Sequence, residues 1–287
     1  MKFCVSSYSF GDYREKDSLG IFGIIDKAAE MGFDGIEFIE DYWLDWPDEE
    51  IKKVGQYARD KGLSTVAFCV GADLINGCGV EPEKEVERIC RLIDKAALLG
   101  VSLLRHDITS GRHGKTNGIG YSCLIPELKE KVTQITEYAK KLGIKTMTEN
   151  HGYFSQDADR VASLIDAVGN DNFGALVDLG NFMCADEEPP LSVSRLCPYA
   201  FHVHCKDFLY KKGTEIDPGE GWFPTRARNY IRGTIVGHGE AKIFQSLRVL
   251  KDRGYDEWLT LEFEGTEDNL VGIRIGLSNM KRFWEMA

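Results

Sequence analysis

Hydrophobic and polar residues along this chain of 287 residues repeat in one unit: an amphipathic helical stretch, a glycine, and a short run rich in apolar and β-forming residues that ends in polar residues. Segments such as AAEMGFDGIEF and AKKLGIKTMTE show the unit. The glycines that follow the helical stretches are Gly32, Gly62, Gly100, Gly143 and Gly254. A glycine at this position is typical of a helix that ends in a left-handed residue.

Two of the amphipathic stretches show the helical period clearly. The first has an apolar stripe made of Val86, Ile89, Cys90, Ile93 and Ala97. The second has an apolar stripe made of Leu128, Val132, Ile135, Ala139 and Leu142. Charged residues between them, Glu85 among them, are expected to face the solvent.

The apolar runs predict eight β-strands, each followed by a helical pattern. The strands are expected near residues 3–8, 35–39, 63–68, 101–106, 144–149, 173–178, 199–205 and 257–263. Strands that alternate with helices form parallel pairs joined by crossover helices. Eight such units close most economically into a (β/α)8 TIM barrel of the α/β class, with residues 1–287 as one domain. A doubly wound open sheet is the alternative, but the sequence has no GxGxxG motif or phosphate-binding loop to accompany it.

Composition places the chain among soluble enzymes and narrows its partners. Hydrophobic residues make up 43% and charged residues 28%, which excludes a disordered chain. No apolar run has the ~18–20 residues of a membrane span. The start, MKFCVSSYSF, lacks the apolar core of a signal peptide, so we expect a cytoplasmic protein without a membrane partner. A net charge of −11 disfavours nucleic acid. The eight cysteines form no CxxC pair and are expected to be small buried residues in a reducing compartment.

Charged and imidazole side chains gather where the last four predicted strands end. These ends carry Glu149-Asn150-His151, Asp178, His204 followed by Lys206 and Asp207, and Glu262 with Glu264. In a parallel barrel all these ends meet at one mouth. Carboxylates gathered there repel one another unless a cation lies between them. Carboxylates with one imidazole suit a divalent ion such as Mn²⁺, Mg²⁺, Co²⁺ or Zn²⁺. Strand alternation alone does not choose between His202 and His204, or between Glu262 and Glu264.

Four motifs make the prediction more specific. In the order TENHG, VDLGN, HVHCKD and GYDEWLTLEFEG, they resemble the xylose-isomerase-like barrel superfamily, most strongly from residue 148 to residue 265. That group holds sugar isomerases and epimerases, inosose dehydratases and the endonuclease IV type of DNA-repair enzyme. The resemblance implies one divalent metal ion bound by Glu149, Asp178, His204 and Glu262. It leaves His202, Glu264 and Asp207 as residues that orient the ligands.

The resemblance also implies a reaction. A metal-dependent isomerase or epimerase of a ketose or related sugar or polyol would use Glu149 and Glu262 as its acid and base. The metal stabilises an enediolate as a Lewis acid while the carboxylates remove and return a proton. An inosose-type dehydratase or lyase, in which the enediolate expels a β-leaving group, is the alternative. Less favoured are a DNA-repair nuclease, whose pattern needs a histidine where this chain has Asn181, and a non-catalytic barrel subunit. Family members are often dimers or tetramers, so a homo-oligomer is expected.

Further residues near the predicted mouth are candidates for binding the sugar. They are Lys206, His151, Trp43 and Arg228. Lys206 alternatively pairs with Asp207 or Glu264, and Trp43, like Trp46, alternatively lies in a subunit interface. His106 is expected at the same rim, in a structural or a binding role. The segment 208–239 exceeds the usual ~12–15 residues of a loop and is expected to be a lid, a disordered loop or an oligomer contact.

Overall fold

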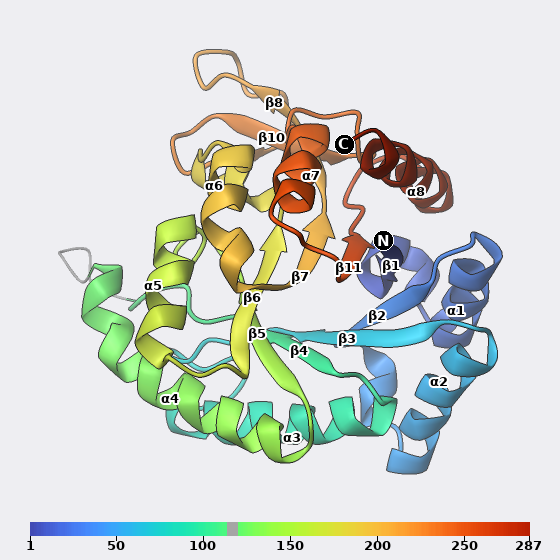
Figure 1. The fold of residues 1–287 in the computed structure, drawn as a ribbon, viewed down its shortest axis with the longest axis vertical. Helices are drawn as coiled ribbons and strands as arrows, with labels where there is room; N and C mark the ends of the chain where they lie inside the picture. The colour runs from blue at the N-terminus through green and yellow to red at the C-terminus, as the bar shows by residue number, and fades with distance from the viewer. Residues whose placement is uncertain (114–119) are drawn as a thin grey trace.

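A closed barrel of parallel strands forms the centre of the computed structural model, which describes residues 1–113 and 120–287 (Figure 1). Its strands, in chain order, are β1 Lys2–Ser6, β2 Gly35–Ile39, β3 Ser64–Val70, β4 Leu103–His106, β5 Lys145–Glu149, β6 Phe173–Asp178, β7 Ala200–Cys205 and β11 Trp258–Leu261. Each strand pairs with its neighbours in chain order, and β11 closes the ring against β1. The predicted (β/α)8 barrel is confirmed.

A helix follows each barrel strand and covers the outside of the barrel (Figure 1). The helices are α1 Gly20–Glu30, α2 Asp48–Asp60, α3 Glu85–Leu99, α4 Tyr121–Lys141, α5 Ala158–Val168, α6 Pro189–Leu196, α7 Ile243–Asp252 and α8 Asn269–Met286. All five glycines predicted to end helices have a left-handed φ, between 73° and 83°. A residue with a side chain would be strained there, which is why glycine ends these helices.

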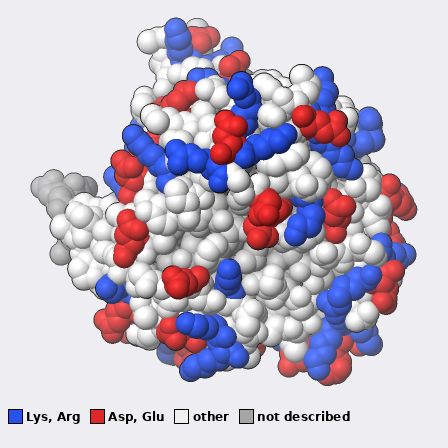
Figure 2. Space-filling model, in the orientation of Figure 1, with Lys and Arg blue, Asp and Glu red and all other residues white. Residues whose placement is uncertain are grey.

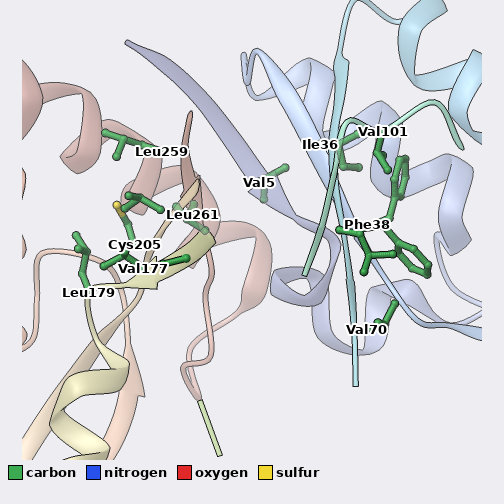
Figure 3. Close-up of a cluster of buried hydrophobic side chains, with 14 of the residues drawn as sticks. Val5, Ile36, Phe38, Val70, Val101, Val177, Leu179, Cys205, Leu259 and Leu261 are labelled. Carbon is green, nitrogen blue, oxygen red and sulfur yellow. The ribbon is translucent and has the colours of Figure 1, made fainter. Parts of the chain in front are cut away.

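The core fills the space between the barrel and its helices. Figure 3 shows part of it in two groups: Val5, Ile36 and Phe38 on one side, and Val177 and Leu261 on the other. A separate cluster, which includes Cys4, Cys69, Leu103, Met147 and Leu176, packs around the barrel interior. Neighbouring residues of one strand therefore serve different clusters, as Cys4 and Val5 do in β1 and Leu103 and Leu104 do in β4.

Helix α3 corrects one detail of the predicted pattern. Ile89 and Ile93 are buried as expected, but Ala97 is exposed and Glu85 is buried. Glu85 accepts hydrogen bonds from the backbone N–H groups of Asp73 and Cys78 and from the Arg88 guanidinium. Its carboxylate is buried because it holds the loop after β3 onto the start of the helix. The members of the second predicted stripe that lie in α4 are buried, whereas Leu142, just after the helix ends, is 45% exposed.

The long segment after β7 contains a small sheet that the sequence pattern did not predict. Its strands are β8 Asp207–Lys211, β9 Phe223–Pro224 and β10 Tyr230–Thr234, antiparallel in the order β8-β10-β9. β8 and β10 extend beyond the ring of helices at the top of Figure 1. A Cβ on Gly233 would overlap the carbonyl oxygen of Glu264, so β10 passes directly against the chain that follows β11. The segment is therefore a structured wall beside the barrel mouth.

The cysteines and the surface charges give no specific indication of function. All eight cysteines are free, and Cys78 and Cys123 are exposed rather than buried as expected. Basic and acidic side chains are mixed over the face drawn in Figure 2. In the part of the chain that the structure describes, no helix has both the length and the apolar character needed to cross a membrane.

Candidate active site

Four side chains from four strands meet inside the barrel mouth. Glu149 ends β5, Asp178 ends β6, His204 lies near the end of β7, and Glu262 follows β11. One ligand atom from each lies within 4.8 Å of the others. Asp178 and His204 are direct neighbours in the register of β6 and β7. The structure thus brings together the four residues that the resemblance implied as metal ligands.

The imidazole of His204 is oriented by a residue that the sequence analysis missed. Glu37, in the middle of β2, accepts hydrogen bonds from Nε2 of His204 at 2.9 Å and from Nε2 of His202 at 3.0 Å. Because Nε2 of His204 donates a hydrogen bond to Glu37, Nδ1 faces the other three residues. The distances from Nδ1 to carboxylate oxygens of Glu149, Asp178 and Glu262 are 4.0, 3.8 and 3.3 Å. A carboxylate behind a histidine is the usual support of a metal-binding imidazole. His202 and Glu37 therefore act together behind the ligand.

Replacing Glu37 with alanine should lower the free energy of unfolding by about 3–5 kcal/mol, because two buried imidazoles lose their shared acceptor. Urea denaturation would measure the change. Glu37→Gln keeps the volume and one acceptor oxygen, so its loss should be smaller. Glu257→Ala, at an exposed position before β11, is the control and should change the value by less than about 0.5 kcal/mol. An unchanged stability in Glu37→Ala would contradict this role.

The negative charge of the cluster raises the proton affinity of Asp178 and His204. Burial, together with the Glu149 and Glu262 carboxylates, raises the pKa of Asp178 to about 7. Burial opposes the charged form of His204, yet Glu37 and Glu262 raise its pKa well above the usual value. A site that attracts protons this strongly also attracts a metal cation, which would replace them.

The donor atoms fit a divalent ion. Oδ2 of Asp178 and Nδ1 of His204 are buried without a hydrogen-bond partner among the described residues, and both point into the cluster. Buried polar atoms are rarely left without a partner, so an ion bound between them would satisfy both. Three carboxylates and one imidazole suit Mn²⁺, Mg²⁺, Co²⁺ or Zn²⁺. A second group, Glu37 with His202 and His204, also lies close enough to hold an ion. In this group Nε2 of each imidazole already contacts Oε2 of Glu37, so the group supports His204 from behind.

Glu149 is held on both sides. Oε2 accepts from Nε of Arg105 at 2.7 Å, and Oε1 accepts from the side-chain amide of Asn181 at 2.8 Å. Arg105 lies in β4 and also contacts Asp107 at 3.2 Å. The sequence analysis did not single out Arg105, although an arginine inside an otherwise apolar strand, LLRH, was a visible signal. Asn181, at the position where the nuclease pattern needs a histidine, holds Glu149 by this amide contact.

Lys206 lies on the other side of the cluster. Its Nζ is 2.7 Å from Oε2 of Glu262, 3.2 Å from Glu264 and 3.7 Å from Asp178. The lysine is buried, and although burial disfavours its charge, these carboxylates raise its pKa well above the usual value. Glu262 has its pKa lowered well below the usual value, because Lys206 and His204 outweigh the effect of burial. The Lys206 side chain therefore holds a fixed positive charge against the Glu262 carboxylate.

A cavity of about 310 Å³, here called the mouth cavity, opens onto this cluster. It is lined by Tyr8, Ile39, Glu40, Cys69, Gly71, Arg105, Glu149, His151, His204, Lys206, Glu262 and Glu264. His151 is at its rim, where Nδ1 lies 2.9 Å from Oδ1 of Asp107. The volume is at the lower end of the range for small-molecule pockets, about 300–1,000 Å³. Two predicted sugar-binding residues, Lys206 and His151, thus face the cavity.

The other two predicted sugar-binding residues lie elsewhere. Trp43 is 1% exposed and packs against Phe38 and Phe68, so it belongs to the core and not to the pocket wall. Arg228 is exposed in the turn between β9 and β10, with a left-handed φ of 68°. Among the described residues that line the mouth cavity, neither side chain is present.

Asp207 and His106 also differ from expectation. The Asp207 carboxylate points away from Lys206 and accepts from the backbone N–H groups of Gly237, Gly239 and Ala241. It holds the GHGE turn before α7, since successive residues of a strand face opposite sides. His106 is fully buried, stacks on Phe173, and does not reach the rim.

Comparisons with known proteins agree with this architecture. The family model described as a xylose isomerase-like TIM barrel matches residues 25–283. The chain is 24% identical over 242 residues to 3-oxo-isoapionate decarboxylase from Pectobacterium atrosepticum, covering 82% of this chain and 76% of that protein. It is 25% identical over 138 residues to inosose dehydratase from Clostridium perfringens, covering 48% of this chain and 46% of that protein. The solved structure of an L-ribulose 3-epimerase, 16% identical, matches 100% of this chain and 95% of its own with a TM-score of 0.75. This structural likeness concerns the fold, and all three similar proteins are enzymes.

Proposed function

The chain belongs to the xylose isomerase-like TIM-barrel family, and on that premise we propose that it is a divalent-metal-dependent isomerase or epimerase of a ketose or related sugar or polyol. The observation that carries the proposal is the placement of Glu149 and Glu262 in one cluster with Asp178 and His204. The two glutamates come from β5 and the end of β11, which β6 and β7 separate in the barrel. They therefore approach a substrate in the mouth cavity from two sides.

Asp178 and His204 would hold the metal ion together with one oxygen from each glutamate. When bound, the ion supplies Lewis-acid stabilisation of the negative charge that develops on a carbonyl oxygen. The proton next to that carbonyl is then acidic enough for a carboxylate to remove. This division leaves the protein residues with two tasks, which are binding the ion and moving the proton.

The surroundings of the two glutamates suit those tasks. Arg105 and Asn181 fix the Glu149 carboxylate in one orientation. Lys206 fixes Glu262 and, by lowering its pKa, keeps the carboxylate ionised. A carboxylate held in place by neighbouring donors needs little reorganisation when the proton moves. One glutamate removes the proton and the other returns one to the opposite face, which inverts the carbon.

A dehydratase or lyase is the second candidate, and Lys206 is the observation that favours it. Elimination needs one base and one acid for the leaving group, and Glu262 with the charged Lys206 supplies such a pair at 2.7 Å. The two curated relatives are named a decarboxylase and a dehydratase, and both names describe the release of a small molecule from the substrate. Both candidates begin with the same carbanionic intermediate, so the fate of that intermediate decides between them.

Solvent-exchange NMR tests the proposal. Protein loaded with Mn²⁺ would be incubated in D₂O with D-fructose, L-ribulose and an inosose. The Mn²⁺ would be removed after the incubation, before the spectra are recorded. An isomerase or epimerase places deuterium on the carbon next to the carbonyl of at least one ketose and yields an isomer of equal composition. A product that has lost water would instead establish the second candidate. No exchange and no elimination with any of these compounds would contradict both.

A further inference from the structure

A second cavity lies beside the mouth cavity. This side cavity has a volume of about 250 Å³. It shares His151, Lys206 and Glu264 with the mouth cavity, so the two are neighbours with a common boundary. Apart from Asn181, which holds Glu149, the remaining walls of the side cavity take no part in the proton-transfer or metal-binding tasks described above.

Three of the seven remaining lining residues are aromatic. Tyr153 comes from the loop after β5, while Phe208 and Phe223 come from β8 and β9 of the small sheet. The rings of Phe208 and Phe223 meet edge to face, with centroids 5.8 Å apart. Gln156 and Asn181 add amide groups to the same cavity. Aromatic faces with a few hydrogen-bonding groups are the combination that binds a ring with one apolar face.

Tyr153 is held in an unusual conformation that displays its ring. Its φ is 59°, in the left-handed region that bulky residues rarely adopt. Its N–H donates to Oε1 of Gln156 at 2.6 Å, and its phenol donates to the carbonyl oxygen of Pro224 at 2.7 Å. Although both ends are fixed, the residue remains 42% exposed. Backbone strain of this kind persists where the surroundings enforce it, and it concentrates at binding sites.

The small sheet that supplies the other rings is also anchored. The Asp186 carboxylate accepts from the hydroxyl of Thr225, the backbone N–H of Ala227 and the side-chain amide of Asn229. Arg226 pairs with Asp157 at the start of α5. These contacts fix the turn between β9 and β10, and with it the position of Phe223, before any ligand binds. Preorganised walls reduce the ordering cost of binding.

We propose that the side cavity is a second subsite, and that the substrate consists of two linked rings. The reacting keto-sugar would occupy the mouth cavity, and the ring attached to it, a second sugar or an aryl group, would lie against Tyr153 and Phe223. This proposal rests on the proposed function for the identity of the first ring. Its claim about the second ring concerns binding and holds whether the reaction is isomerisation or elimination.

Binding of matched one-ring and two-ring probes tests the subsite without turnover. Calorimetric titration of the Mg²⁺-loaded protein would compare D-fructose with lactulose, which carries a second sugar on the same ketose. A second pair, methyl β-D-glucoside and phenyl β-D-glucoside, tests an aryl second ring. At least one two-ring probe should bind about tenfold more tightly than its one-ring partner. The pair that shows the preference identifies the second ring as sugar or aryl.

Two variants link the preference to the aromatic wall. Tyr153→Gly removes the ring while tolerating the left-handed φ, and Phe223→Ala removes the second ring. Each should lower two-ring binding toward the one-ring value and leave one-ring binding unchanged. Tyr153→Phe keeps the ring and should keep the preference. Thermal denaturation of every variant would show whether the fold is retained.

Three results would overturn the subsite: equal binding within both pairs, no binding by any probe, or a preference that survives in both Tyr153→Gly and Phe223→Ala. Failure of the proposed function looks different. In that case the two-ring preference persists, but no deuterium enters any ketose in D₂O.

Discussion

Purified protein incubated with Mn²⁺ is expected to retain about one ion per chain after dialysis, and the Asp178→Ala/His204→Ala variant about none. The two residues are neighbours in the register of β6 and β7, and each has a buried atom that faces the cluster without a partner among the described residues. Removing both leaves two glutamates already paired with Arg105 and Lys206. Elemental analysis by mass spectrometry would measure the ratio of metal to protein.

A matched control for this experiment is available on the same molecule. Asp252→Ala/His238→Ala removes the same residue types from exposed positions and should leave the metal content unchanged. Metal retained in the Asp178→Ala/His204→Ala variant would show that the ion binds elsewhere. About three ions per chain in the unmodified protein would instead revive the nuclease hypothesis. No binding even with excess Mn²⁺ would remove the basis of the enzymatic proposal.

Replacing either Glu149 or Glu262 with glutamine should lower the rate of α-proton exchange by about 10²–10⁴-fold. A glutamine oxygen still faces the ion, so the metal content should stay close to that of the unmodified protein. The amide cannot accept the proton, which is why exchange fails while binding persists. Deuterium incorporation into the ketose identified by NMR would give the rate, and elemental analysis the metal content.

The relative size of the two losses also separates the candidate functions. Inversion needs both glutamates, so an epimerase should lose activity to a similar extent in Glu149→Gln and Glu262→Gln. Elimination by Glu262 and Lys206 should be far more sensitive to Glu262→Gln. Glu257→Gln, at the exposed residue before β11, is the control and should keep full activity. Undiminished exchange in Glu149→Gln would exclude its role as acid or base.

The local pattern of hydrophobic and polar residues predicted much of the fold. Most barrel strands are short apolar or β-rich runs after a glycine or a turn, and the helices have apolar stripes, so both periods are visible without tertiary contacts. The small sheet escaped because its strands are five, two and five residues long and lie in a polar segment. Strands that short form through pairing with each other, and their pattern alone is too brief to identify them.

The candidate site likewise has one part that the sequence predicted and one part that it did not. Glu149, Asp178, His204 and Glu262 could be singled out because parallel strands bring their ends to one mouth, whatever the distances in between. The residues that hold these side chains in place could not be singled out from the sequence. Glu37 is 167 residues from His204, and Arg105 is 44 residues from Glu149, in strands whose role in the site only the closed barrel reveals.

The sequence by itself therefore determined the barrel and the chemical types at its mouth, because periodicity and strand order are properties of the chain. The tertiary structure decided which side chains face one another. It placed Trp43 in the core, Asp207 under the GHGE turn, and Tyr153 beside the small sheet. These placements depend on the packing of distant segments, and packing energy is shared among residues that no local pattern connects.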